Sequence, residues 1–275
     1  SSIISSKEEA TLNKTTVFNP EKALLYGVGT MNFVPLEIIE ELPKDAKYGR
    51  IDLLPSSIRL IDIQDHLHDI GTRTHYSTSP MGVIQKYIKP FFKNYDYILI
   101  DCPPNLGFVS QNGLEVSDYY IIPTVPDRLS TYGIPQIARK IDELRIARKL
   151  NLICLGIIIT KYQSNRSQFT QTLDRLPEDL KAAFQGMKED TPPVFNNSLP
   201  QSNTFSEAMV FDHKIKNYRE KYSKNLVKGI DGVSKAVYQH GEDLALELEM
   251  RIKEVQQRKP KQDPDDQDDS DLMQT

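Results

Sequence analysis

Long apolar runs and cysteine are both scarce in this 275-residue sequence. No run approaches the roughly 20 apolar residues that a transmembrane helix needs, and the N-terminus carries no signal-peptide pattern. The two cysteines, Cys102 and Cys154, are too few for a disulfide framework and lie in apolar segments, so we expect buried free thiols. These absences predict a soluble, cytoplasmic protein.

A third absence concerns phosphate binding. None of the 13 glycines is followed by lysine, so the loop pattern G-x-x-x-x-G-K-[ST] is not present. Asn13-Lys14-Thr15-Thr16 is similar to the end of such a loop, but no glycine precedes it to let backbone amides approach a phosphate. We therefore expect no phosphate-binding loop in the sequence given.

What the sequence does contain is a series of apolar segments that end in proline. Residues 95–107 read YDYILIDCPPNLG, which predicts a strand that ends at Asp101. A carboxylate at the carboxyl edge of an open parallel sheet can hold the Mg²⁺ of a nucleoside triphosphate, usually through water. Asp101 is therefore our candidate for a catalytic and metal-binding residue of the Walker B type. The alternative is an aspartate that only caps the next helix.

Helix and strand patterns alternate after this motif. The spacing predicts a short helix at 107–114, a strand at 118–126, a helix at 128–150 and a strand at 152–160. Such alternation indicates an α/β protein with a parallel β-sheet flanked by helices. A further helical pattern runs from 217 to 255 and is interrupted by three glycines.

Composition divides the chain into four predicted parts. Residues 1–49 form an irregular segment, 50–240 the core, 241–259 a C-terminal helix, and 260–275 a disordered acidic tail. The tail holds one lysine and six aspartates of the 34 basic and 38 acidic residues, which leaves 33 and 32 in the remainder. The net charge of -4 thus comes from the tail.

Basic residues crowd one segment near the end of the core. One interpretation is a surface that contacts DNA phosphates without reading bases. The alternative is a solvated helix face that Asp212 and Glu220 balance. The basic residues concerned are Lys214, Lys216, Arg219, Lys221 and Lys224.

Several of these motifs, taken in order, resemble the ParA/MinD-type deviant Walker ATPases, and within them the partitioning ParA proteins. That family opens with a Gly-rich loop, a helix and a strand that carries a catalytic aspartate, none of which the sequence given contains. We expect a fragment that lacks its first βα unit; the alternative is a homologue that lost the loop. The similar segments span roughly residues 50–240 and are Ile51 to Ser57, Tyr95 to Gly107, Ile122 to Gly133, Ile158 to Tyr162 and Ser198 to Ala208.

The resemblance implies a P-loop NTPase fold, ATP and Mg²⁺ as cofactors, and a homodimer that forms with ATP. It also implies non-specific DNA binding on the nucleoid and hydrolysis stimulated by a ParB-like centromere-binding partner, with no membrane contact. The intact protein would be an ATPase, and the chain as given would be inactive. Gln201 and Thr204 stand where the family often carries basic residues, which argues against DNA binding.

Nucleotide contacts are implied for five positions near two strand ends. For Asp127 the alternative is a helix cap, and for Lys161 an ordinary surface position. The five residues are Pro123, Pro126, Asp127, Thr160 and Lys161.

Two functions of other classes stay open. A MinD-like regulator of the cell-division site would attach to the membrane through a basic amphipathic C-terminal helix, but here the last helix runs into an acidic tail that anionic lipids repel. The other is a non-catalytic scaffold or DNA-binding module of the same fold.

Overall fold

The computed structural model describes residues 40–41, 52–53, 82–103, 106–185, 191–204, 222–223 and 225–258. The chain separates into two compact units. The first takes in residues 1–118 and 140–152, and the second takes in residues 119–139 and 153–275. Helix α6 (Arg128–Arg148) contributes to both.

The described part of the first unit is mainly helical. β1 (Glu40–Glu41) pairs antiparallel with β2 (Asp52–Leu53), and α4 (Val83–Tyr87) leads into the 3-10 helix η3 (Lys89–Asn94). α5 (Phe108–Glu115), which the sequence predicted, packs against α4. Asn112 fixes this contact, because its Nδ2 donates to Phe108 O at 2.8 Å while its Oδ1 accepts from Ile84 N at 3.3 Å.

The segment before α5 is not a strand, so the prediction of a strand that ends at Asp101 is wrong for this structure. Among the described residues it has no partner strand, and Tyr97 and Leu99 are 61% and 87% exposed. Ile100 and Cys102 nevertheless both face α5, as alternation along an extended segment predicts. A Cβ added to Gly113 of α5 would lie 3.1 Å from Ile100 Cγ2 and 3.2 Å from Cys102 Sγ. The apolar pattern sets which side chains face α5, but a ladder also needs a neighbouring strand.

The second unit is built on a parallel sheet with strand order β3-β4-β5. β3 (Tyr119–Thr124) and β5 (Leu199–Pro200) both pair in parallel with the central strand β4 (Ile153–Tyr162). The predicted fold class is confirmed. Residues 155–159 of β4 are buried without alternation, which is typical of a parallel strand covered on both faces.

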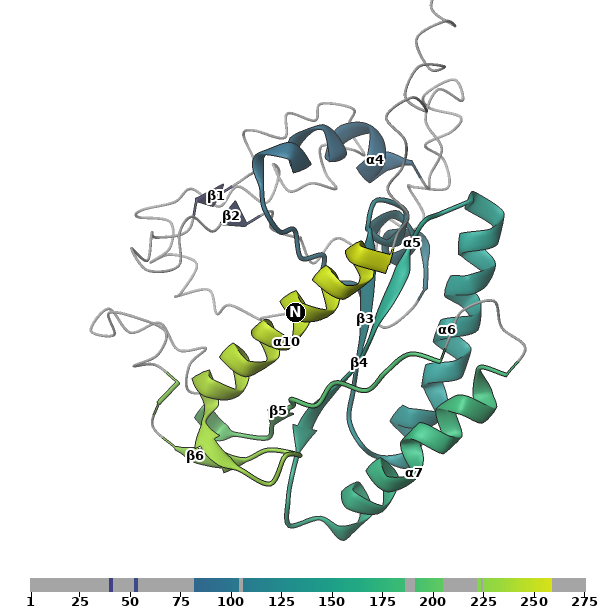
Figure 1. Ribbon diagram of the computed structural model, residues 1–275. Helices are drawn as coiled ribbons and strands as arrows, with labels where there is room; N and C mark the ends of the chain where they lie inside the picture. Colours follow the sequence, from purple (N-terminus) through teal and green to yellow (C-terminus); the bar gives the residue numbers. More distant parts are fainter. Residues whose placement is uncertain are drawn as a thin grey trace, which may run out of the picture. The chain divides into compact units, whose positions relative to one another are not determined.

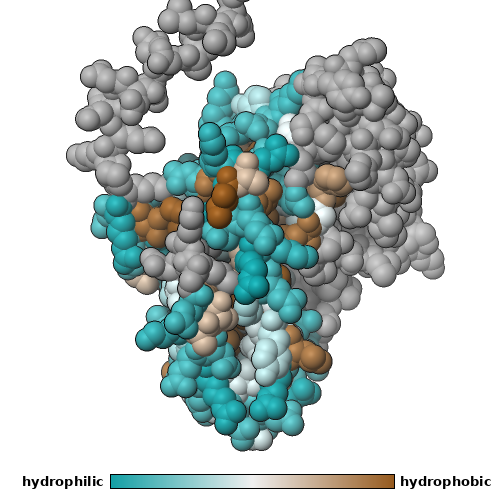
Figure 2. All heavy atoms as spheres, turned by 90° about the vertical axis from the view of Figure 1, so that its right-hand side faces the viewer, coloured by the Kyte–Doolittle hydropathy of each residue, from teal (hydrophilic) through white to brown (hydrophobic). Residues whose placement is uncertain are grey.

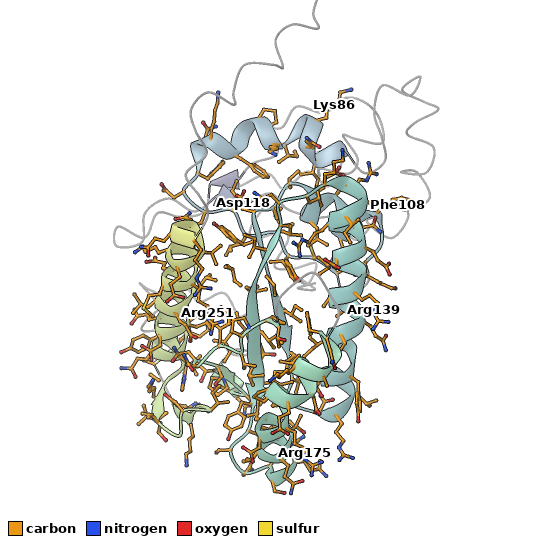
Figure 3. All side chains as sticks on the ribbon, turned by 45° about the vertical axis from the view of Figure 1, so that its right-hand side comes forward. Lys86, Phe108, Asp118, Arg139, Arg175 and Arg251 are labelled. Atoms are coloured by element: carbon orange, nitrogen blue, oxygen red, sulfur yellow. The ribbon has the colours of Figure 1, made fainter. Side chains whose placement is uncertain are left out.

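Helices cover this sheet from two sides (Figure 1). α7 (Ser167–Ala183) and the first half of α6 lie on one side of β3 and β4, and α10 (Val237–Arg258) lies on the other, as Figure 3 also shows. α7 buries Phe169, Leu176 and Leu180. α10 packs against β4, β5 and β7 (Ser234–Ala236).

A hairpin stands within residues 217–255, where the sequence predicted a helical pattern interrupted by three glycines. β6 (Leu226–Lys228) pairs antiparallel with β7, and the turn between them is closed by Gly229 N, which donates to Val233 O at 3.1 Å. Gly232 in this turn has φ +77, a value that glycine adopts without strain. The helix therefore begins only at Val237, not at 217, and earlier than the predicted boundary at 241.

The described surface is mainly hydrophilic on the face shown in Figure 2, with separate hydrophobic areas. Leu129 and Tyr132 on α6 and Leu246 and Met250 on α10 are among the exposed apolar side chains. Within the described ranges, none of the helices combines the length and the apolar character needed to cross a bilayer.

Candidate functional site at the carboxyl edge of the sheet

The three parallel strands of the second unit are tied together where they end. Thr160 Oγ1 of β4 donates to Thr124 O, the last residue of β3, at 3.1 Å. On the other side of β4, Gln201 N donates to Tyr162 O at 2.8 Å just after β5. Open parallel sheets bind ligands beyond the carboxyl ends of their strands, so we take this edge as the candidate site.

The end of β3 and the loop that follows it carry three of the predicted nucleotide residues. Pro123 is exposed and lies in β3, which has a ladder partner on one side only among the described strands, a position at which a sheet tolerates proline. Pro126 is almost fully buried. The two prolines therefore fix the shape of the loop between β3 and α6.

Asp127 is the N-cap of α6. Its Oδ1 accepts from Ser130 N and its Oδ2 from Ser130 Oγ, both at 2.8 Å, while Thr131 N donates to the Asp127 carbonyl at 3.1 Å. Both carboxylate oxygens thus serve the first turn of the helix, which is the alternative that the sequence left open. A nucleotide contact by this side chain stays a prediction.

Thr160 and Lys161 end β4 with an irregularity. The pairing with β5 shifts between Thr160 and Tyr162, which leaves Lys161 as the extra residue. Lys161 has φ +53, in the left-handed region that side chains rarely adopt, and it is exposed. Lys161 is thus an exposed residue at the carboxyl edge, where its contact with a nucleotide base stays a prediction.

Asp101 belongs to the first unit, where it is exposed and follows the extended segment. Cys102 beside it is exposed as a residue, not buried as expected, although its Sγ lies toward Gly113. This partial burial raises the pKa of the Cys102 thiol, and the charge of Asp101 raises it further. No cluster of three or more metal-ligating side chains occurs in the part of the chain that the structure describes.

The residues at the edge fit one end of a nucleotide only. At the end of β4, Lys161 offers an exposed ammonium group, while the Thr160 hydroxyl already donates to Thr124 O. A triphosphate needs a cradle of backbone amides and a lysine, and the sequence given has no Gly-Lys pair to supply them. The basic residues predicted to contact DNA, Lys214, Lys216, Arg219, Lys221 and Lys224, lie outside the described residues, as does the acidic tail.

Sequence reasoning missed one buried ion pair in this unit. Glu247 and Arg251 of α10 lie 2.8 Å apart, with side chains only 5% and 14% exposed. The signal was available, because both charges fall among the apolar residues Leu244, Leu248 and Ile252 of the helix. Charges in an apolar stripe of a helix need buried partners.

The fold is an α/β protein with a parallel sheet, and comparisons with known proteins narrow the class. The family model AAA_31, an AAA domain, matches residues 9–154, more than half of the chain. The chain belongs to this family and is of the ParA/MinD type.

Two curated relatives and two solved structures illustrate the similarity. The chromosome partitioning protein ParA of Myxococcus xanthus is 28% identical over 128 residues, which cover 46% of this chain and 42% of that protein. The sporulation initiation inhibitor protein Soj of Bacillus subtilis is 24% identical over 168 residues, or 61% and 60%. The chain spans about half the length of the curated relatives it matches.

Among solved structures, apo McdA of Cyanothece has a TM-score of 0.59 at 15% identity, with 90% of this chain and 83% of that chain covered. A variant of McdA solved as an ATP complex gives a TM-score of 0.56, also at 15% identity, with 87% and 77% covered. At these identities the likeness concerns the fold alone.

Proposed function

We propose that the protein is a ParA-type partition ATPase of the cytoplasm that acts on the nucleoid. It binds Mg-ATP, forms a homodimer with the nucleotide, binds DNA without sequence preference, and hydrolyses ATP when a ParB-like partner stimulates it. The family match over residues 9–154 carries this proposal. The carboxyl edge of the parallel sheet supports it, because such an edge is the place where this type of fold binds nucleotides.

Each residue predicted for the nucleotide site has a role in this proposal. Asp101 holds the hydration shell of Mg²⁺ and is the catalytic residue in the chain given. Pro123 and Pro126 shape the loop next to the base. Thr160 and Lys161, at the end of β4, contact the base or ribose. Asp127, at the start of α6, contacts the base or ribose as well. The groups that grip the phosphates come from a Gly-Lys loop that the sequence given does not contain.

ATP turnover tests the proposal. The 275-residue chain should show no Mg-dependent hydrolysis, because a carboxylate without loop amides and a lysine does not hold or polarise the phosphates. A longer form that carries a Gly-Lys loop should hydrolyse ATP, and Asp101→Ala in that form should reduce turnover about 100-fold.

The control is Asp96→Ala, which removes another exposed carboxylate from the same segment and should leave turnover unchanged. Turnover by the chain as given would show that the active site lies elsewhere. Parental turnover in the Asp101→Ala variant of the longer form would make Asp101 a structural residue only.

Because the sequence given contains no Gly-Lys loop, a second candidate function is a non-catalytic DNA-binding scaffold of the same fold. A longer form that binds duplex DNA but neither binds nor hydrolyses ATP would support the scaffold over the ATPase.

A further inference from the structure

A β-bulge in β4 releases one carbonyl group that α10 takes up. Tyr120 pairs with Cys154 and Ile121 with Gly156, so Leu155 is the extra residue between them. Arg251 Nη1 donates to Leu155 O at 2.9 Å. A buried carbonyl group that has no hydrogen-bond partner lowers the stability of the fold. The bond from Arg251 supplies that partner and thereby ties α10 to the central strand.

Gly156 makes room for this contact. It has φ +137, and an added Cβ would collide with Pro193 O and lie 2.6 Å from Arg251 Nη1. Any side chain there would displace both the guanidinium and the segment at Pro193.

The same guanidinium reaches the segment that precedes β5. Arg251 Nη2 donates to Val194 O at 2.9 Å and to Glu247 Oε1 at 2.8 Å. The guanidinium carbon also lies 3.8 Å from the centre of the Phe195 ring, which is close enough for a cation–π contact. Figure 3 shows Arg251 between α10 and the strands.

Glu247 holds the next two residues of that segment. Its Oε1 accepts from Asn196 N at 2.8 Å, and its Oε2 accepts from both Asn197 N and Asn197 Nδ2 at 2.9 Å. Burial by itself raises the pKa of this carboxyl, but the backbone donors of Asn196 and Asn197 together with Arg251 lower it overall. The pair therefore grips residues 193–197 from one turn of α10.

These residues lead straight to the candidate site. Phe195 N donates to Ile157 O at 2.9 Å, and Ile157 N donates to Pro193 O at 2.9 Å, so the gripped segment is also paired with β4. β5 follows at Leu199, and Gln201 N then closes on Tyr162 O at the carboxyl edge. A shift of residues 193–197 would move the end of β5 with it.

We propose that Glu247 and Arg251 form a positioning clamp, through which α10 sets the place of β5 and of residues 201–204 at the carboxyl edge of the sheet. The clamp thereby controls one wall of the site at which a nucleotide base binds, a consequence that rests on the proposed function. Displacement of α10 by a partner would loosen this wall without touching the site itself.

Residue-resolved amide hydrogen exchange on the 275-residue chain tests the clamp. Glu247→Gln keeps the shape but turns one of the two acceptor oxygens into a donor, and Arg251→Lys keeps the charge but loses the fork. In both variants the amides of Asn196, Asn197 and Gln201 should exchange at least about tenfold faster, while those of the β3–β4 ladder keep the parent's rates. Glu249→Gln and Arg258→Lys, two exposed positions of the same helix, are the matched controls and should exchange like the parent.

Two outcomes would overturn the proposal. Faster exchange at Asn196 and Asn197 with an unchanged Gln201 would mean that the pair fixes only a local turn. Acceleration of the β3–β4 ladder by the same factor would mean that the pair stabilises the whole unit without positioning β5. If Glu247→Gln does not fold, the milder Arg251→Lys variant decides between these outcomes.

Titration with a fluorescent adenosine nucleotide tests the consequence for the site. If the parent chain binds the nucleotide, Glu247→Gln should weaken binding about tenfold and Glu249→Gln should not. Equal affinity in the parent and Glu247→Gln would overturn control of the site by the clamp. A longer form that carries a Gly-Lys loop and still binds no nucleotide would count against the proposed function, and the exchange rates of the 275-residue chain would still decide the clamp.

Discussion

Both carboxylate oxygens of Asp127 accept hydrogen bonds from Ser130 in the first turn of α6. A carboxylate in this position also favours the helix electrostatically, because the helix N-terminus carries a partial positive charge. At the scale of the residue, the cap is therefore sufficient to explain why an acid follows Pro126. Lys161 differs from Asp127. Its backbone has a strained φ of +53, and no contact within the described residues explains this strain.

Removal of the cap should weaken the fold measurably. We expect Asp127→Ala to lower the free energy of unfolding by about 1 kcal/mol, and Asp127→Ser, which keeps an acceptor oxygen, to lower it by less. Urea unfolding followed by circular dichroism measures both. If Asp127→Ala unfolds at the parent's midpoint, the cap contributes no stability and the carboxylate is retained for a ligand.

Element by element, two buried strands and two of the helices could be predicted, and the paired or interrupted elements could not. β3, β4, α5 and α6 follow from apolar periodicity alone, because each is decided by local burial. The hairpin of β6 and β7 could not be read from its short strands, although Gly229 and Gly232 mark the turn. The segment before Asp101 failed for another reason, since its ladder depends on a partner that lies outside its own sequence.

α7 was missed although its core residues are regularly spaced. Phe169, Leu176 and Leu180 lie on one face, but most other positions are polar and Pro177 falls inside the helix. Proline in a helix interior argues against helix in a sequence, and here tertiary burial of the apolar face outweighs it.

Gly156 in the bulge of β4 and Gly241 in α10 should respond to replacement by alanine in opposite ways. Gly156→Ala should lower the free energy of unfolding by about 2 to 4 kcal/mol, because the new Cβ meets Pro193 O at an unfavourable φ. Gly241→Ala in α10 has open space around it and should instead raise stability by up to about 1 kcal/mol. Thermal and urea unfolding of the two variants side by side provide the measurement. A neutral Gly156→Ala variant would show that the bulge and its contact with Arg251 adjust freely.

At the scale of the whole molecule, the sequence was sufficient to recognise the family but predicted only part of the candidate site. The motifs at residues 122–133 and 158–162 lie where β3 and β4 end, so the sequence predicted these two strand ends correctly, whereas the strand it predicted before Asp101 is not formed. The pair of Glu247 and Arg251 joins α10 to a segment some 50 residues earlier, a contact that no local pattern encodes. The prediction of Asp101 as a magnesium residue depends on groups beyond the sequence given and stays a prediction.

DNA binding is a property of the whole charge distribution, and salt dependence tests it. If the basic cluster contacts phosphates, replacement of Lys216, Arg219 and Lys224 by Gln in an ATP-bound longer form should weaken binding about equally on unrelated duplexes. The slope of log affinity against log salt should become shallower by up to about 0.9 per residue. Deletion of residues 260–275 should strengthen binding, because it removes a competing polyanion. The matched control replaces three exposed basic residues of the first unit, Lys140, Arg148 and Lys149, by Gln and should keep the parent's slope. If the cluster variant keeps the affinity and slope of the parent, these charges form a solvated face, and the proposed partition function must hold its DNA elsewhere.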